Sequence, residues 1–140
     1  MPGRSVTVHE NGRHARTVDV GPHRLTADEP EPIGTDLGPT PVELLVAGLG
    51  TCTSMTVRMY AERKGWVLTG VDVSARMDRG YGPRGQIVKD VELSGDLDGE
   101  QISRLATIAE HCPVQRMLGD SVHVHTRVTV RPPVSPAAAA

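Results

Sequence analysis

Aromatic side chains are almost missing from this 140-residue chain, which has no Phe, one Trp and two Tyr. A core must therefore be built from Val, Leu, Ile, Ala and Met, and a small domain of this kind buries little apolar area alone. The length fits one domain and leaves no room for a second catalytic domain. We therefore expect the chain to form an oligomer, most simply a homodimer.

An excess of basic residues is also missing. The 15 Lys and Arg residues are balanced by 17 Asp and Glu residues, which gives a formal net charge of −2. No basic run is interleaved with aromatic residues. A nucleic-acid partner is therefore not expected, and a DNA-binding stress regulator is disfavoured.

Long apolar runs are absent as well. The N-terminal MPGRSVTVHENGR lacks the apolar stretch of a signal peptide, and no run reaches the roughly 18 apolar residues of a membrane span. These features predict a cytoplasmic protein with no membrane partner. Because that compartment keeps thiols reduced unless they are catalytic or redox-sensing, the two cysteines, Cys52 and Cys112, are poor candidates for a structural disulfide.

Alternating polar and apolar residues predict strands in the first part of the chain. Three such segments lie between Ser5 and Ala27, separated by Asn11-Gly12 and Gly21-Pro22. They predict a three-stranded meander. The stretch 28–40 is rich in Pro and Gly and predicts a loop.

A long helix is predicted to follow Thr40 and to run to Lys64. Thr40 suits the N-cap, Pro41 suits the first helical position, and Glu43 falls where a capping box has its carboxylate. Gly65 then suits the C-terminal end. The first half of this helix is apolar all round, which predicts that it lies in a core.

The rest of the chain predicts three strands and two helices. In chain order they are strand 67–77, strand 86–94, a helix capped by Asp98, a short helix that starts at Pro113, and strand 121–130. The sequence DRGYGPRG between the first two predicts a hairpin tip, and residues 131–140 predict a disordered tail. The order of elements predicts a single α+β domain over residues 1–130, not a wound parallel sheet.

The two cysteines occupy different settings. Cys52 lies in the middle of the long helix among apolar residues, a setting typical of a buried structural cysteine. Cys112 directly precedes Pro113, where the free N–H groups and the positive dipole end of the short helix favour a thiolate. Residue chemistry alone therefore predicts that Cys112 is the more acidic thiol.

Two motifs in this order resemble a known family. The segment GPTPVELLVAGLGTCTSMTVRMYAERKGW combines a Pro-x-E-L-L helix start with a cysteine in mid-helix, and HCPVQRML carries the second cysteine some sixty residues later. Their spacing resembles the OsmC/Ohr superfamily of osmotically inducible and organic-hydroperoxide-resistance proteins over roughly residues 21–130. The resemblance implies an OsmC/Ohr-like α+β fold, an intertwined homodimer with active sites near the subunit interface, and no metal or organic cofactor.

The resemblance also implies a function. Cys52 matches the peroxidatic cysteine, which becomes a sulfenic acid, and Cys112 matches the cysteine that resolves it as a disulfide. An external dithiol, a lipoyl group in characterised Ohr-like members, restores both thiols. The apolar setting of Cys52 suits an organic or lipid hydroperoxide better than hydrogen peroxide. The implied activity is a cysteine-based organic hydroperoxide reductase.

A peroxidatic thiol in apolar surroundings has a raised pKa unless a cation or a hydrogen-bond donor lies nearby. The family usually supplies an Arg from the N-terminal strands, positioned by a Glu at the start of the cysteine helix. Arg24 is our first choice for this cation, with Arg13 and Arg16 as alternatives. Glu43 is the matching carboxylate, but Val42 stands where the best-studied Ohr-like pattern has its Glu. Glu43 is thus either an activator or only a helix cap.

Two other functions stay open. The displaced Glu allows a stress-associated protein that keeps the fold without peroxidase chemistry. A metal site is the other alternative, because four potential ligands are close in sequence: His111, Cys112, His123 and His125. Their spacing matches no familiar zinc pattern, and the zinc content of the native protein would discriminate.

Overall fold

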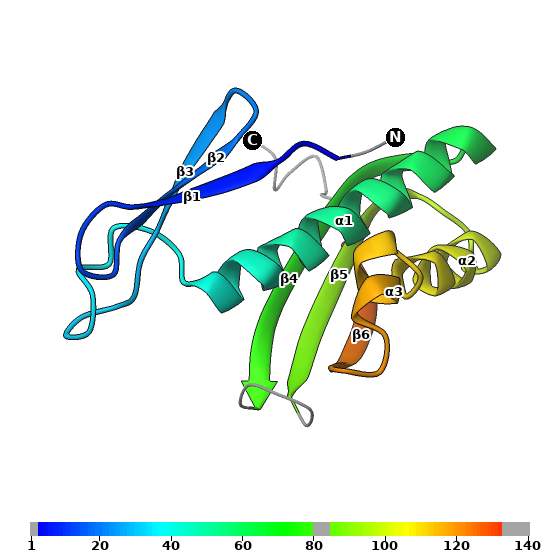
Figure 1. Cartoon of the computed structure of the whole chain (residues 1–140). Coiled ribbons are helices and arrows are strands. Elements are labelled where there is room, and N and C mark those ends of the chain that lie inside the picture. The colour runs from blue at the N-terminus through cyan, green and yellow to red at the C-terminus, as the bar shows by residue number, and fades with distance from the viewer. Residues whose placement is uncertain (1–2, 80–84, 133–140) are drawn as a thin grey trace, which may run out of the picture. The chain divides into compact units, whose positions relative to one another are not determined.

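The computed structural model describes residues 3–79 and 85–132. The chain divides into two compact units, unit 1 up to residue 45 and unit 2 from residue 46 onward. Within these described residues, the strands of two three-stranded sheets are interspersed with three helices (Figure 1), which confirms the predicted α+β class. The predicted hairpin tip at 80–84 and most of the predicted tail, residues 133–140, lie outside the described residues.

Unit 1 begins with the predicted meander. Its strands are β1 (Val6–Glu10), β2 (Arg16–Val20) and β3 (His23–Ala27), and they pair antiparallel in the order β1-β2-β3. Apolar residues lie opposite one another across the strands, with Val18 between Val8 and Leu25. Such cross-strand pairs stabilise a sheet and fix its register.

The loop that follows β3 is organised around one buried carboxylate, Asp28. Its Oδ1 accepts a hydrogen bond from the N–H of Glu29 at 2.7 Å, and its Oδ2 accepts from the N–H of Leu37 at 3.2 Å. Thr35 donates to Oδ2 through both its N–H and its hydroxyl. These donors, foremost the N–H of Glu29, hold the pKa of Asp28 below its usual value. One charged side chain therefore replaces the regular hydrogen bonding that this Pro-rich segment lacks.

Helix α1 (Pro41–Lys64) starts and stops where the sequence predicts. Thr40 and Glu43 form the predicted capping box: the Thr40 hydroxyl accepts from the N–H of Glu43 at 3.1 Å, and Glu43 accepts from the N–H of Thr40 at 2.8 Å. The helix is not interrupted at its internal glycines. It ends before Gly65, whose φ of 70° belongs to the left-handed region that favours glycine.

The prediction that the first half of α1 is buried all round is wrong. Leu45 is 44 % exposed, and further along the helix Met55 and Met59 are each 60 % exposed. One helix face supplies the buried residues, which are Val46, Leu49, Thr53, Val57, Tyr60 and Ala61. Within the chain, α1 is buried along one face only, so apolar residues at other angles around its axis stay exposed.

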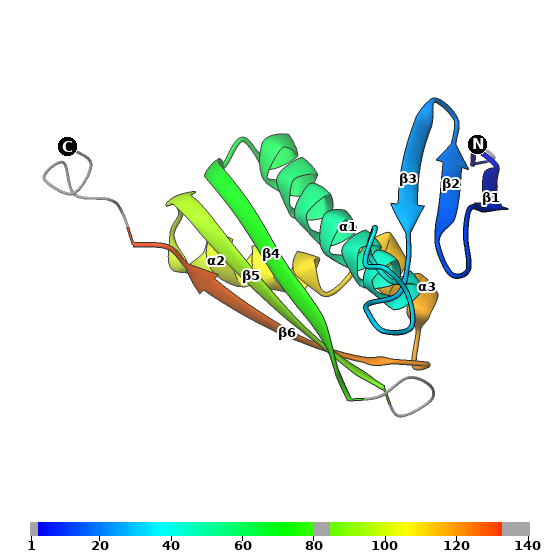
Figure 2. The same ribbon diagram turned by 90° about the vertical axis from the view of Figure 1, so that its left-hand side faces the viewer.

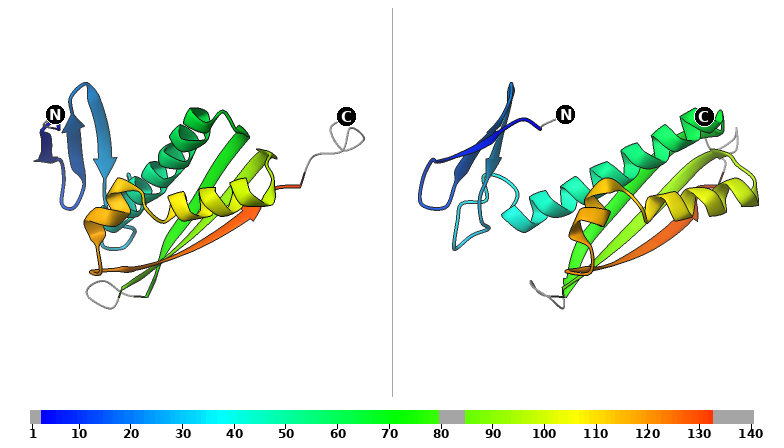
Figure 3. Two further views of the ribbon diagram at one scale, coloured as in Figure 1. Left: turned by 90° about the vertical axis from the view of Figure 1, so that its right-hand side faces the viewer. Right: turned by 45° about the vertical axis from the view of Figure 1, so that its right-hand side comes forward.

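Unit 2 contains a second sheet with helices on one face. The sheet consists of β4 (Val67–Arg79), β5 (Gln86–Asp96) and β6 (His123–Val130), and its helices besides α1 are α2 (Gly99–Ala109) and α3 (Pro113–Leu118). Strands β4 and β5 are antiparallel, whereas β6 runs parallel to β5. Figures 2 and 3 show α1, α2 and α3 on the same side of the sheet. The chain passes through α2 and α3 between β5 and β6, the crossover that a parallel pair requires.

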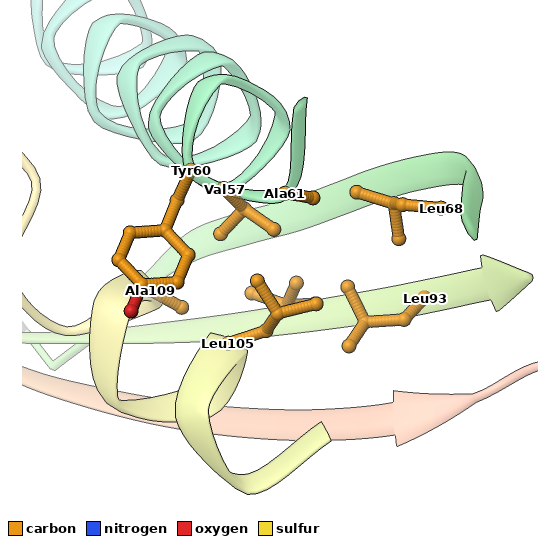
Figure 4. Packing of buried hydrophobic residues seen from close by; sticks show 8 residues of the cluster. Val57, Tyr60, Ala61, Leu68, Leu93, Leu105 and Ala109 are labelled. Carbon is orange, nitrogen blue, oxygen red and sulfur yellow. The ribbon is translucent and has the colours of Figure 1, made fainter. Parts of the chain in front are cut away.

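The core of unit 2 lies between these helices and the sheet. Figure 4 shows side chains from α1, β4, β5 and α2 packed against one another. The cluster consists of Val57, Tyr60, Ala61, Leu68, Val91, Leu93, Leu105 and Ala109. The predicted cap of the second helix is confirmed by the Asp98 capping box, and Leu105 and Ala109 are the buried residues of that helix.

Strand β5 alternates between buried and partly exposed residues for most of its length. Its buried row contains Ile87, Lys89, Val91 and Leu93. The period of two places all four side chains on the face that the helices cover. Lys89 is thus a lysine in a row of core residues, and this places an amine inside unit 2.

Gly95 near the end of β5 has no room for a side chain. Its φ is 143°, and a Cβ atom there would lie 2.1 Å from the carbonyl oxygen of Val67. Gly95→Ala is therefore expected to lower the free energy of unfolding by about 2 kcal/mol, measured by urea denaturation of the reduced protein. Gly99→Ala is the matched control, because a Cβ at Gly99 meets nothing within 4 Å. Equal unfolding midpoints for the two variants would contradict the expectation.

Candidate active site

Cys52 lies on the fourth turn of α1 and is partly exposed. Its sulfur is 4.0 Å from the hydroxyl oxygen of Thr56, one helical turn further on. Met55 and Met59 follow Cys52 by three and seven residues, so the two exposed thioether side chains lie on the same side of the helix. Cys52 thus lies on a side of the helix that also carries exposed apolar side chains.

Cys112 is fully buried and forms the N-cap of α3. Its sulfur accepts a hydrogen bond from the N–H of Gln115 at 3.5 Å, and Pro113 occupies the first helical position. A sulfur at this place receives the free N–H groups of the helix start, which favour a thiolate over a thiol. The structure thus provides the helix-terminus geometry that the sequence predicted for Cys112.

Thr53 links the two cysteine-bearing elements. It is completely buried, and its hydroxyl lies 2.9 Å from the carbonyl oxygen of Leu49 and 3.5 Å from the sulfur of Cys112. A hydroxyl has one proton to donate, so it can serve only one of these acceptors fully at a time. The sulfur of Cys112 therefore has one donor from α3 and a second from α1.

Lys89 reaches the same place from the sheet and is 0 % exposed. Its Nζ donates to three oxygen atoms: the Thr53 hydroxyl at 3.0 Å, the Ala109 carbonyl at 2.7 Å and the Gln115 side-chain carbonyl at 2.6 Å. An ammonium has three N–H donors, and all three have partners here. The site thus joins α1, β5, the end of α2 and the start of α3 around one amine.

The acidity of Cys112 follows from this arrangement. Burial raises the pKa of its thiol, but hydrogen bonds from Thr53, from the N–H of Gln115 and from Cys52, together with the charge of Lys89, outweigh burial and lower the pKa below its usual value. Cys52 thus takes part in stabilising a negative charge on Cys112.

The two other predicted site residues, Arg24 and Glu43, lie in unit 1 and have partners of their own. Arg24 is on β3, and its Nε donates to Oδ1 of Asp19 at 2.7 Å. Glu43 is engaged in the capping box with Thr40. Of the alternative cations, Arg16 donates to the carbonyl of Ala15 at 2.9 Å. The structure therefore gives Glu43 a capping contact and pairs Arg24 with the partly exposed carboxylate of Asp19.

The residues weighed as metal ligands are not gathered into a metal site. The rings of His123 and His125 lie 4.2 Å apart on β6, and His111 contacts the carbonyl of Thr107 through Nδ1. Within residues 3–79 and 85–132, no three His, Cys, Asp or Glu side chains are placed to hold an ion together. The metal alternative therefore has no geometric support in this part of the chain.

Sequence reasoning missed Thr53 and Lys89. The signal for Lys89 was present, because Ile87, Val91 and Leu93 mark the buried register of the strand and Lys89 falls in it. A lysine is almost never fully buried without partners, so its place in that register predicts a polar site. Thr53 offers no comparable signal, since threonine is common on either face of a helix.

Fold and site define a small α+β protein with paired thiols, and comparison with known proteins gives its family. Residues 34–127 match the family model described as OsmC-like protein. This match spans more than half of the chain, so the protein belongs to the OsmC-like family. The OsmC/Ohr resemblance inferred from the two cysteine motifs is thereby confirmed.

Solved structures share this fold at low sequence identity. An OsmC-like protein from Mycoplasma pneumoniae is 19 % identical with a TM-score of 0.80, over 92 % of this chain and 97 % of that one. The organic hydroperoxide resistance protein OsmC from Legionella pneumophila is 19 % identical with a TM-score of 0.73, covering 94 % and 98 %. An organic hydroperoxide resistance protein from Elizabethkingia anophelis is 16 % identical with a TM-score of 0.73, covering 91 % and 96 %. These likenesses show the fold.

Two further findings concern curated relatives and membrane-spanning helices. No curated protein matches the chain at a significant level. Among the helices of the described residues, none combines the length and the apolar character that crossing a bilayer requires.

Proposed function

We propose that this protein is a thiol-dependent peroxidase that reduces organic hydroperoxides through Cys52, with Cys112 as the resolving cysteine. The observation that carries the proposal is the contrast between the two sulfurs. Cys52 is partly exposed, whereas Cys112 is fully buried and has a lowered pKa. A substrate can reach the first sulfur, while the second holds the negative charge that activates the pair.

The reaction runs in two steps. The buried Cys112 thiolate takes the proton of Cys52, and the Cys52 sulfur attacks the O–O bond, forming an S–O bond and releasing an alkoxide that leaves as the alcohol once protonated. Cys52 is then a sulfenic acid. The Cys112 thiol gives its proton to the alkoxide, and its sulfur, again a thiolate, attacks the Cys52 sulfur; hydroxide leaves and takes up one further proton to become water. The hydroperoxide is reduced by two electrons, and the sulfur pair is oxidised to a disulfide.

The preference for an organic substrate rests on the surroundings of Cys52. Met55 and Met59, both exposed, offer apolar contacts to an alkyl or lipid chain on the same side of α1. Hydrogen peroxide has no group that could use them. Solved relatives of the same fold are named organic hydroperoxide resistance proteins, which supports this class of substrate.

The proposal includes a reductant, a dimer and a compartment. An external dithiol, such as a lipoyl group on a protein, returns the disulfide to two thiols by exchange. We place this cycle in the cytoplasm, where thiols are kept reduced, and in a homodimer of the OsmC type. Arg24 and Glu43 stay candidates for activating Cys52, the role that the family resemblance implies for them, and in this structure Arg24 donates to Asp19.

A single-turnover experiment tests the function. The reduced protein is mixed with one equivalent of an alkyl hydroperoxide, quenched with a thiol-blocking reagent and mapped by peptide mass. We expect a Cys52–Cys112 linkage within minutes, and slower oxidation by hydrogen peroxide. If neither a disulfide nor a sulfenic acid forms, the function is refuted and the chain is a non-catalytic, stress-associated member of its family.

A further inference from the structure

Lys89 is a buried amine without a carboxylate partner. The ion pairs between described side chains involve exposed or partly exposed groups, and none includes Lys89. Its three hydrogen-bond partners are neutral oxygen atoms. A buried ammonium without a counter-charge is strongly unfavourable. The charge of Lys89 must therefore be balanced by another group or be given up.

The sulfur pair is the nearest internal source of a negative charge. The charged groups that act on Lys89 are Cys112, Glu110 and Cys52, in this order. Glu110 is exposed at the end of α2, where water screens its carboxylate. Cys112 is buried with Lys89, and both contact the hydroxyl of Thr53. Hydrogen bonds from the Lys89 amine to the Thr53 hydroxyl and from that hydroxyl to the Cys112 sulfur therefore link the positive and the negative group.

We propose that Lys89 is the proton-exchanging counter-ion of the cysteine pair: it is an ammonium while Cys112 is a thiolate, and it becomes a neutral amine when the pair is oxidised to the disulfide. This inference rests on the proposed function, since it assigns a partner to the same redox step. Lys89 acts on the sulfur through Thr53 and does not contact the hydroperoxide.

The proton balance of the reaction supports this assignment. The reduced pair holds one thiol proton and one negative charge, and the hydroperoxide brings one proton. The products, an alcohol and water, contain three protons between them. The third proton comes from the ammonium of Lys89, so that thiol, thiolate, hydroperoxide and ammonium give disulfide, alcohol, water and amine. Reduction of the disulfide by the external dithiol returns a proton to Lys89.

Thr53 lets the site accept both states of Lys89 without moving a heavy atom. The ammonium donates to the Thr53 hydroxyl oxygen, whose own proton can turn to the sulfur of Cys112 in place of the carbonyl of Leu49. A neutral amine has two N–H donors and one lone pair. The two donors suffice for the carbonyls of Ala109 and Gln115, and the Thr53 hydroxyl can turn its proton to the lone pair.

The electrostatics of the site agree with an exchangeable proton. Burial lowers the pKa of Lys89 below its usual value, and the negative charges at Cys112, Glu110 and Cys52 raise it again in part. Loss of the thiolate on oxidation removes a raising influence, so the pKa of Lys89 falls further. An arginine could supply the charge but could not release the proton.

Lysine NMR tests the inference on the unmodified protein. The chain has two lysines, Lys64 and Lys89, so carbon-13 labelling at Cε gives two signals, and Lys64→Met assigns them. The disulfide form is prepared with diamide, which oxidises thiols without any peroxidase activity. We expect the Lys89 signal to titrate at least about one pH unit lower in the disulfide form than in the reduced form, with Lys64 unchanged. Identical Lys89 titrations in the two forms would overturn the inference.

A variant pair gives a second readout. In Lys89→Met, the ultraviolet absorbance of the thiolate is expected to appear at a pH about one unit higher than in the wild-type protein, whereas Lys64→Met leaves it unchanged. An unchanged thiolate titration in a folded Lys89→Met overturns the inference. If the peroxide forms no disulfide but the diamide form shows the Lys89 shift, the peroxidase function fails and the proton exchange stands.

Discussion

Cys52→Ser is expected to abolish turnover of alkyl hydroperoxide, because a serine hydroxyl at neutral pH cannot replace a thiolate as the nucleophile. Cys112→Ser is expected to behave differently. Its Cys52 still reacts with one equivalent of peroxide to give a sulfenic acid, more slowly because no Cys112 thiolate takes its proton, but no disulfide forms and the cycle stops there. Consumption of peroxide, followed with a dithiol reductant, and the mass of the oxidised peptides distinguish the two variants.

The opposite result would assign the roles the other way round. If Cys112→Ser lost all reactivity and Cys52→Ser still formed one sulfenic acid, the low pKa of Cys112 would be the better guide to the attacking sulfur. Its complete burial argues against that outcome, since a hydroperoxide must reach the sulfur it oxidises. Exposure and acidity favour different cysteines here, and the variants show which property decides.

Thr53→Val is the second change with a large expected effect. Valine keeps the shape of threonine but removes the hydroxyl that accepts from Lys89 and donates to Cys112. The free energy of unfolding of the reduced protein is expected to fall by about 3 kcal/mol, because a buried ammonium donor and a buried sulfur both lose a partner. The pKa of Cys112 rises, so peroxide consumption near neutral pH slows, by roughly tenfold for each pH unit of the rise.

The variant Thr53→Ser distinguishes the effect of the Thr53 hydroxyl from the effect of its packing. Serine keeps the hydroxyl and loses only a methyl group, so it should retain the thiolate titration of the wild-type protein with a smaller loss of stability. Urea denaturation and thiolate absorbance are measured on both variants. Equal effects of Val and Ser on the titration would show that Thr53 acts through packing and not through its hydrogen bonds.

Local signals in the sequence were sufficient for most elements of the fold. The start of α1 was predictable because Thr40, Pro41 and Glu43 favour a helix start at the same point, and the capping box has that form. Cys112 as a thiolate-favouring N-cap was predictable for the same reason, since Pro113 fixes the first turn of α3. Features of this kind depend on residues three or four apart.

The features of the fold and the site that the sequence did not predict depend on contacts between distant segments. The parallel pairing of β6 with β5 joins residues nearly forty positions apart, and no turn signal specifies it. The site has the same character, because Thr53, Lys89 and Cys112 come from three separate segments that only the packing of helices on the sheet unites. Exposure of Met55 and Met59 was missed because periodicity does not tell which face of an apolar helix is covered.

In the proposed reaction the sulfur of Cys112, the N-cap residue of α3, is a reacting atom. This couples the chemistry of the two cysteines to the backbone of α3. As a thiolate, the Cys112 sulfur is a strong acceptor for the N–H of Gln115; in a disulfide it is a weak one. Oxidation thus removes the anchor of a helix of only six residues, whose Gln115 also holds Lys89. We therefore expect the local unfolding free energy of α3 to fall on oxidation: the helix is anchored in the reduced protein and loosened when, in the proposed cycle, an external dithiol must reach the disulfide.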